Sequence, residues 1–472
     1  MSESQMPASE QFNERLEQTL LAPLTRTGPV YRIIMVLLFG IVAWGAYAFS
    51  VQVRQGLIVT AMRDYISWGL YIATFVFFIG ISHAGTLISA ILRVTHAGWR
   101  TPVTRMAEFI TVVALSVGAL FPLIDMGHPE RALNLIKYGR WGSPITWDIL
   151  AISTYLTGSL IYLFLPLIPD LAICRDKLGK QGGTFRRSLY KVMSVGWRDT
   201  SVQKKSLFSG MGVMAILIIP IAVSVHTVVS FIFAMTLRAG WNSTVYGIYF
   251  VAGAIYSGIA TIIIVMVILR KAFHLEEYIT TKHFKNLGYM LGAFVLIMIY
   301  FNLLEFLVPG YKIVEGEGFL LQEILAGMYA PVFWIYIFFG LIIPGIIILV
   351  PRTRTIAGIL VASILINICM AFERFLIVVP VMRVPLMPYE PANYFPSWVE
   401  WSIIAGAVAG FALIISIFAK LVPVISIWEV REQHEEQHAP VATDAGAALP
   451  ETARSLGSGG SFKTNPRAGR KG

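Results

Sequence analysis

The sequence predicts an all-α, polytopic membrane protein with ten transmembrane helices. Of its 472 residues, 56% are hydrophobic and only 14% are charged, whereas a soluble globular domain is typically about half apolar at most. Apolar runs of roughly 20 residues, long enough to cross a ~30 Å hydrocarbon core as a helix, recur along the chain. A β-barrel would instead show alternating segments of about 10 residues.

The ten spans follow one another with short connections. Spans two to five, about 66–236, and spans six to nine, about 244–380, predict two four-helix bundles, with the first and last spans flanking them. This transmembrane domain covers residues 31–430, between an N-terminal segment (1–30) and a tail (431–472) whose few apolar residues predict disorder. The expected spans are 31–52, 66–92, 104–124, 145–169, 208–236, 244–270, 286–308, 329–350, 355–380 and 398–427.

The connections between spans alternate in basic content. Nine Lys and Arg residues lie between Arg175 and Lys205, and further basic residues follow the second, sixth and eighth spans. The positive-inside rule assigns this side and both termini to the cytoplasm, and the other side to the periplasm of a cell (inner) membrane. The same rule explains the net charge of +10, so the lipid bilayer is the expected partner and nucleic acid is not.

The connection from Phe121 to Asp148 is unusually polar for a link between two membrane helices. It holds Asp125, His128, Arg131 and Asp148. Asp148, in the first turn of a span, suits the positive end of the helix dipole, whereas Asp125 at a helix C-terminus does not. Both residues can be plain helix-end residues, but the conflict at Asp125 favours a functional role.

A few ionisable residues fall inside the spans, where they are costly and usually paired or functional. Most lie toward the periplasmic half. Each has a structural alternative: a histidine satisfied by a neighbouring helix, a carboxylate that reaches the interface, or an ion pair. Adjacent residues on a helix point about 100° apart, so we expect Glu373 and Arg374 each to pair with a residue on a different span. These residues are His83, His226, Glu305, Glu373 and Arg374.

These groups suit the oxidation of a quinol, which loses two protons and two electrons. A quinol ring needs an apolar slot with an aromatic wall, which Trp68 is placed to supply. Each hydroxyl needs an acceptor that takes a proton near neutral pH, as histidine and a partly buried aspartate do. His83 lies about 18 residues into its span, ~27 Å along a helix, so we expect it on a proton path rather than in the site.

We expect no metal, haem or iron–sulfur cluster in this chain. Cys174 and Cys369 are far apart and outside any metal-binding motif. His83 and His226 could flank a haem, but their spans place them at different depths.

Quinol oxidation then requires a partner subunit with iron–sulfur clusters or haem over the periplasmic loops. The Pro- and Tyr-rich loop 382–398 is a candidate docking surface, with interfacial anchoring as the alternative.

Four segments carry a resemblance to a known family. SHAGTLISAILR, FPLIDMGHPERA, GSPITWD and AFERFLIVVP resemble the NrfD/polysulfide reductase membrane subunits over roughly residues 30–430, and most of all the larger such subunit of alternative complex III. The resemblance implies oxidation of menaquinol or ubiquinol near the periplasmic face. It further implies an iron–sulfur subunit on that face, c-type haem subunits and a second NrfD-like membrane subunit as partners.

Motif matches within this resemblance add His128 and Arg131 to the candidate quinol site and also include His83. The full expected site is Asp125, Asp148, His128, Arg131, His226 and Trp68, and the expected proton path is His83, Glu305, Glu373 and Arg374. A secondary transporter, or a structural anchor without its own quinone site, is the alternative function.

Overall fold

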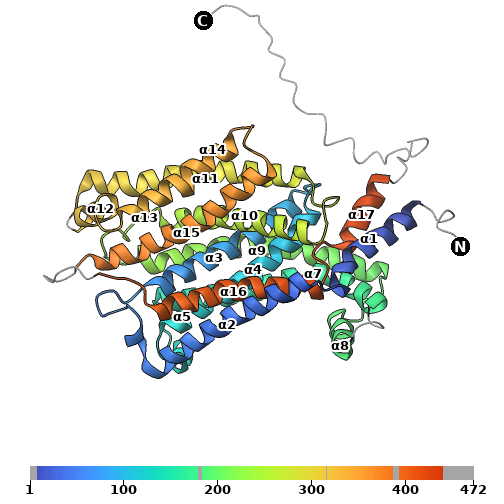
Figure 1. Cartoon of the computed structure of the whole chain (residues 1–472), viewed down its shortest axis with the longest axis horizontal. Coiled ribbons are helices and arrows are strands. Elements are labelled where there is room, and N and C mark those ends of the chain that lie inside the picture. The colour runs from blue at the N-terminus through green and yellow to red at the C-terminus, as the bar shows by residue number, and fades with distance from the viewer. Residues whose placement is uncertain (1–7, 179–182, 315, 386–392, 439–472) are drawn as a thin grey trace, which may run out of the picture. The chain divides into compact units, whose positions relative to one another are not determined.

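The computed structural model describes residues 8–178, 183–314, 316–385 and 393–438, and its described regular structure is helical. The ten predicted spans are all present as helices long and apolar enough to cross a membrane (Figure 1). They are α2 (Pro29–Gln55), α3 (Leu70–Val94), α4 with α5 (Thr101–Gly118, Leu120–Asp125), α7 (Pro144–Leu178), α9 (Ser201–Ala234), α10 (Tyr246–Ala272), α11 (Thr281–Lys312), α13 to α14 (Ala330–Leu349), α15 (Ile356–Arg383) and α16 (Trp398–Leu421).

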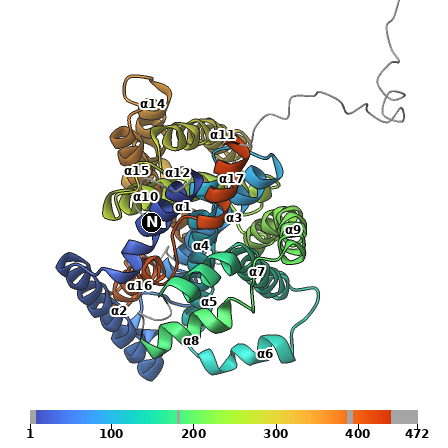
Figure 2. The ribbon, with the colours of Figure 1, turned by 90° about the vertical axis from the view of Figure 1, so that its right-hand side faces the viewer.

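The spans pack as the two predicted four-helix bundles. Helices α3, α4, α7 and α9 form bundle one, and α10, α11, α14 and α15 form bundle two. Figure 2, which looks along the helices, shows the two groups beside each other. Helices α2 and α16 pack against each other and flank bundle one through contacts of α16 with α4. Both bundles therefore repeat the same up-down order of four helices.

The bundles meet where α3 and α10 lie close together. A Cβ atom on Gly258 of α10 would lie 2.1 Å from the Ala84 Cβ of α3, and one on Gly80 would lie 3.6 Å from the Ser257 hydroxyl. Small residues let membrane helices approach closely enough for dispersion contacts and interhelical hydrogen bonds. This contact places α3 at the centre of the fold, between α4, α9, α10 and α15.

Several helix ends differ from the sequence prediction; α7, for example, ends at Leu178 rather than 169, and α9 begins at Ser201 rather than 208. The second span begins at Leu70 rather than near residue 66. The last span ends at Leu421 rather than 427, because Pro423 has no amide hydrogen to donate and restricts Val422 to extended backbone. The eighth span contains a π-helical turn, η4 (Tyr336–Ile342), a feature that the sequence did not reveal.

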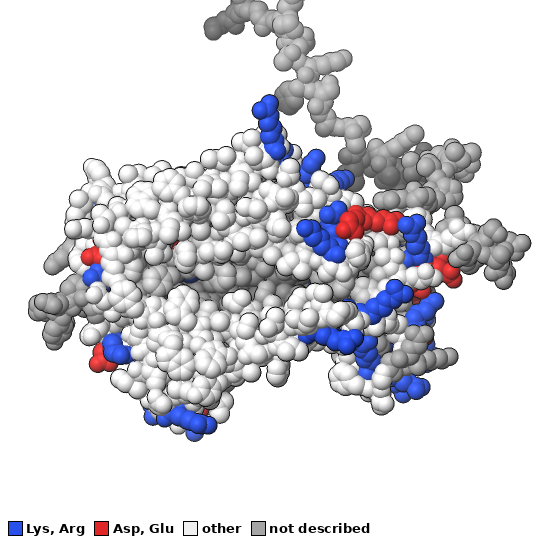
Figure 3. Space-filling view, in the orientation of Figure 1, with Lys and Arg blue, Asp and Glu red and all other residues white. Residues whose placement is uncertain are grey.

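Charged residues mark the two ends of the spans. Lys and Arg gather at the end that carries the connections 95–100, 183–200, 273–280 and 350–355, and the surface between the ends is almost free of charge (Figure 3). We call this end the basic end and the other the opposite end. The opposite end carries the connections 56–69, 126–143, 235–245, 313–329 and 384–397, of which 315 and 386–392 lie outside the described residues.

The segments outside the spans are also partly helical. Helix α1 (Ala8–Thr25) buries Leu16, Leu20 and Leu24. The chain divides into residues 1–430 and 431–472, and α17 (Ile427–His438) crosses this boundary. Residues 431–438 are thus helical, where the sequence predicted a disordered tail, and the remainder of that tail lies outside the described residues. The short helices α6 (Ala132–Lys137), α8 (Thr184–Met193) and α12 (Glu317–Leu325) lie in connections.

Close contact at Gly258 predicts a specific loss of stability. Gly258→Ala should destabilise the protein by about 1–3 kcal/mol, because the added methyl group forces α3 and α10 apart in a packed interface. The matched control is Gly212→Ala on α9, where an added Cβ meets nothing within 4 Å and alanine favours the helix. Thermal unfolding in detergent, followed by size-exclusion chromatography, should show a lower midpoint for the first variant only. Equal midpoints would contradict the assigned packing.

Candidate functional site

All four helices of bundle one place candidate site residues at the opposite end. Trp68 lies just before α3, Tyr71 lies in the first turn of α3, Asp125 ends α5, Asp148 is the fifth residue of α7, and Phe233 lies in the last turn of α9. Asp148 is 6% exposed, and its Oδ1 atom is buried without a hydrogen-bond partner. The Oδ1 atom of Asp125 is likewise buried and unpartnered. At the same end of bundle one, two carboxylates therefore each have a buried oxygen that can accept a hydrogen bond or a proton.

A polar network surrounds Asp125. The Gln52 Nε2 atom of α2 donates to the carbonyl oxygen of Ile124 at 2.7 Å, and the Tyr71 hydroxyl donates to Gln52 Oε1 at 2.7 Å. These bonds fix the end of α5 against α2 and α3. Glu400 of α16 lies within electrostatic range of both Asp125 and Tyr71. Asp125 thus shares its surroundings with a second carboxylate.

Glu400 is a buried residue that the sequence analysis missed. It accepts hydrogen bonds from the backbone N–H groups of Ala61 and Ser397, each at 2.8 Å, and from the Tyr394 hydroxyl. Tyr394 in turn accepts from the Leu70 backbone N–H at 2.8 Å, at the first residue of α3. Burial and the adjacent Glu400 raise the pKa of Tyr394 well above its usual value. The S-x-x-E spacing of Ser397 and Glu400 before an apolar run is a capping box, the signal that could have found it.

The polar connection between Asp125 and Asp148 is mostly exposed. His128 Nδ1 lies 2.8 Å from Glu130 Oε1, with both side chains more than half exposed, and Arg131 is exposed as well. Hydrogen bonds from its own backbone N–H and from His128 hold the pKa of Glu130 below its usual value. The structure therefore separates the six expected quinol-site residues: His128 and Arg131 lie on the surface, whereas the others are buried or half-buried.

An aromatic row leads from the opposite end into the membrane. The Trp68 ring lies 5.8 Å from the rings of both Phe233 and Trp241, and the Phe233 ring lies 5.8 Å from that of Phe250. Phe250 of α10 contacts His226 of α9, with ring centroids 6.4 Å apart. Trp241 is fixed by a 2.7 Å hydrogen bond from its Nε1 to the Ile377 carbonyl. Trp68 and His226 are thus connected through aromatic side chains.

His83 and His226 lie in direct contact, so the prediction that they sit at different depths was wrong. Their ring centroids are 5.0 Å apart. Because α3 begins at Leu70, His83 lies only about 20 Å from its start, nearer the middle of the membrane than the sequence indicated. Both residues are fully buried, and no ring nitrogen of either makes a hydrogen bond of standard geometry, although the Ala222 carbonyl lies near His83.

A charged pair lies beside the two histidines. Arg374 Nε is 3.2 Å from Glu373 Oε2, so these residues pair with each other, whereas the sequence predicted separate partners. The Tyr249 hydroxyl of α10 donates to Glu373 Oε1. The Arg374 guanidinium lies 4.9 Å from the centre of the Phe250 ring, and its two terminal nitrogens have no hydrogen-bond partner. The guanidinium thus reaches the Phe250 ring, which also contacts His226.

The fourth expected path residue, Glu305, has a hydrogen-bond partner of its own. It is half-buried on α11 and accepts a 2.7 Å hydrogen bond from the Ser243 hydroxyl. One turn earlier on α11, the Asn302 side-chain amide donates to the hydroxyl of Tyr336 in η4 at 2.7 Å. Among the described residues, no group of three or more His, Cys, Asp or Glu is arranged to hold a metal ion.

Comparisons with known proteins identify a family and several relatives of this chain. The family described as "Polysulphide reductase, NrfD" matches residues 58–385. A selenate reductase subunit of Mesobacillus selenatarsenatis is 26% identical over 84% of this chain and 94% of its own length. The Hdr-like menaquinol oxidoreductase integral membrane subunit of Archaeoglobus fulgidus is 24% identical over 86% and 96%. The menaquinone reductase integral membrane subunit of Nitratidesulfovibrio vulgaris is 23% identical over 83% and 91%.

The family match covers both four-helix bundles and the connection between them, from residue 58 to residue 385. It includes Trp68, both histidines, both unpartnered aspartates and the Glu373–Arg374 pair. With ten helices able to span a membrane, the chain is a multi-pass membrane protein that belongs to the polysulphide reductase NrfD family.

Proposed function

We propose that this chain is the quinol-binding integral membrane subunit of a multi-subunit quinol oxidoreductase of the alternative complex III type. The observation that carries the proposal is the opposite end of bundle one, where two buried carboxylates with unpartnered oxygens lie at the same end as Trp68 and Phe233. Two relatives are named as a menaquinol oxidoreductase subunit and a menaquinone reductase subunit, which supports menaquinol as the substrate; ubiquinol is the alternative quinol.

In this proposal the quinol ring lies against Trp68, and Asp125 and Asp148 accept its two hydroxyl protons. A carboxylate without a hydrogen-bond partner in a dry environment gains stability when it takes up a proton, because protonation removes the buried charge. His128 and Arg131 lie on the exposed connection above, where they can admit the quinol head group or pass the protons to solvent. By the positive-inside rule, the opposite end is the periplasmic face and the basic end is cytoplasmic.

The two electrons leave through a partner. We assign them to an iron–sulfur subunit docked on the periplasmic face, followed by c-type haem subunits, in a complex that contains a second NrfD-like membrane subunit. The connection 126–143 supports a docking role. Its large apolar side chains are strongly exposed: Leu133 by 72%, Ile136 by 77% and Trp141 by 78%. Exposed apolar residues of this size at the rim of a membrane domain mark a protein or lipid contact.

Protons can also reach the middle of the membrane. His226 and His83 continue the aromatic row inward, and Arg374, paired with Glu373, contacts the same Phe250 ring. We propose that this group, with Glu305, relays protons between the bundles and couples quinol oxidation to proton translocation.

A secondary transporter is the second candidate, because two bundles with the same helix order resemble the internal repeats of transporters. Purification of the native protein separates the two functions. Co-purification with iron–sulfur and haem subunits, together with bound quinone, is expected for the redox complex. A chain isolated without redox partners, that moves a solute across liposomes, would contradict the proposal.

Removing either proton acceptor should slow quinol oxidation in the intact complex. We expect Asp125→Asn and Asp148→Asn each to lower kcat by ~10²-fold or more, the usual contribution of a positioned general base, with normal assembly. Asp64→Asn is the matched control, since Asp64 is exposed at the same end of the molecule. Turnover is measured with a soluble quinol analogue. Wild-type rates in both site variants would overturn the site assignment.

The aromatic wall should affect substrate binding more than chemistry. Trp68→Ala should raise KM for the quinol by about 2- to 10-fold, corresponding to the ~0.5–1.5 kcal/mol of an aromatic contact, while Trp68→Phe should largely restore it. Trp401→Ala, which removes an exposed tryptophan from the first turn of α16 at the same end, serves as the control. An unchanged KM for Trp68→Ala would exclude Trp68 from the quinol slot.

A further inference from the structure

The interior of bundle one carries polar side chains on facing sides of three helices, between the histidine pair and the basic end. The polar residues of α3 follow the spacing i, i+4, i+7, and those of α7 follow the same spacing. The two polar residues of α4 follow the spacing i, i+3. Residues at these spacings share one face of a helix. All are buried, with at most 2% exposed surface. They are Ser82, Thr86 and Ser89; Tyr155, Ser159 and Tyr162; and Glu108 and Thr111.

The upper part of this polar column surrounds the Tyr155 hydroxyl. Tyr155 donates to the Ser82 carbonyl at 3.0 Å, and the Thr111 hydroxyl donates to the same oxygen at 2.7 Å. Thr86 and Ser159 lie close to the Tyr155 hydroxyl, yet the hydroxyl oxygens of both are buried without a hydrogen-bond partner of standard geometry. Buried hydroxyls of this kind are usually satisfied by internal water.

The lower part of the column ends at Glu108. The Ser89 hydroxyl donates to Glu108 Oε1 at 2.6 Å and lies 3.3 Å from the Tyr162 hydroxyl. The second carboxylate oxygen, Oε2, is buried without a partner. One helical turn, about 5 Å, separates Ser89 from Thr86 and Tyr162 from Ser159. The hydroxyls of α3 and α7 thus recur at each turn from the histidine pair to Glu108.

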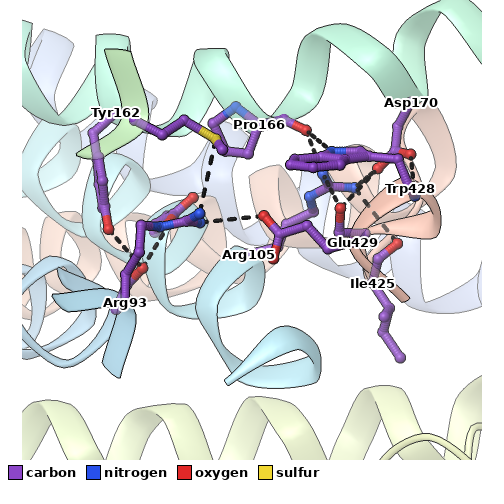
Figure 4. A network of polar contacts seen from close by, with 12 residues as sticks. Arg93, Arg105, Tyr162, Pro166, Asp170, Ile425, Trp428 and Glu429 are labelled. Carbon is purple, nitrogen blue, oxygen red and sulfur yellow. Dashed lines mark hydrogen bonds and ion pairs between the residues drawn. The ribbon is translucent and has the colours of Figure 1, made fainter. Parts of the chain in front are cut away.

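Charged residues at the basic end join Glu108 to the C-terminal segment (Figure 4). Arg93 Nη2 lies 3.8 Å from Glu108 Oε1 and 3.3 Å from Glu429 Oε1. Glu429 is held there because Asp170 accepts hydrogen bonds from the backbone N–H groups of Ile427 and Trp428, each at 3.2 Å. Glu108 therefore lies between a hydroxyl column on one side and a charged cluster on the other.

The neighbouring Arg105–Asp170 pair differs from Glu108 in its bonding. Arg105 pairs with Asp170 and also donates to the Pro166 carbonyl at 2.7 Å and to the Ser426 hydroxyl at 3.1 Å. With the two backbone donors above, both oxygens of Asp170 have partners. This pair anchors the chain after α16. Glu108, by contrast, keeps a free buried oxygen and has a hydroxyl as its shortest contact.

We propose that Glu108 is a proton-transfer residue, at the basic-end terminus of a hydroxyl and water column that conducts protons to the His83–His226 pair. The proposal rests on the quinol oxidoreductase function above. A proton that enters at the basic end binds Glu108, moves through Ser89 to Tyr162, and continues past Ser159, Thr86 and Tyr155. At each step one O–H bond breaks as the next O–H or N–H bond forms, and no electron moves.

The test uses the purified complex in liposomes that contain a pH-sensitive dye, with quinol oxidation and proton movement measured together. Glu108→Gln should lower the rate of proton transfer across the membrane by at least ~10-fold while quinol oxidation in uncoupled liposomes stays within twofold of wild type. Glu108→Asp should restore part of the proton transfer. Ser89→Ala, which leaves every charge in place, should lower it in the same way.

Glu429→Gln is the matched control, because it removes a carboxylate from the same Arg93 cluster on the side away from the hydroxyl column. It should keep the wild-type ratio of protons to electrons. Where Glu108→Gln fails to assemble, Ser89→Ala decides the question. Wild-type proton transfer in Ser89→Ala or in assembled Glu108→Gln would overturn the proposal. A wild-type complex that oxidises quinol without moving protons would overturn it, together with the proposed proton translocation, but would leave the quinol oxidoreductase function standing. Absence of quinol oxidation would overturn that function as well.

Discussion

The fold and its sites depend on the cost of placing polar groups in hydrocarbon. An unpaired buried polar group costs several kcal/mol and a charge costs more, so each must find a partner, bind water or face a substrate. Glu373 satisfies much of this demand by pairing with Arg374 and Tyr249. The carboxylates of Asp125 and Asp148 do not, since each keeps a buried oxygen without a partner. We therefore place the oxidation of the quinol at these two carboxylates.

The position of α3 connects these exceptions. It touches all the other helices of bundle one and two helices of bundle two, and its contact with α10 is close because Gly258 has no side chain. One face of α3 presents His83 to α9, while the face with Ser82, Thr86 and Ser89 meets α4 and α7. A helix that shares contacts with so many neighbours can hold proton-carrying groups at fixed separations along most of the membrane thickness.

The ten spans and their grouping followed from the sequence, because length and apolar content determine where a helix can cross a bilayer. The sequence did not indicate which residues the buried charged side chains would contact. Glu108 and Asp170 lie near the expected ends of spans three and four, where nothing in the pattern separates them from interfacial residues. The structure extends α7 to Leu178 and thereby buries Asp170. Likewise, the contact between His83 and His226 depends on where α3 begins and how α9 packs, which residue counting does not reveal.

The position of the quinone in the native complex tests the central claim most directly. A cryo-electron microscopy map of the complex with its quinone bound should show the head group at the opposite end of bundle one, against Trp68 and within hydrogen-bonding distance of Asp125 or Asp148. A head group bound at the basic end, or inside bundle two away from these residues, would contradict the account.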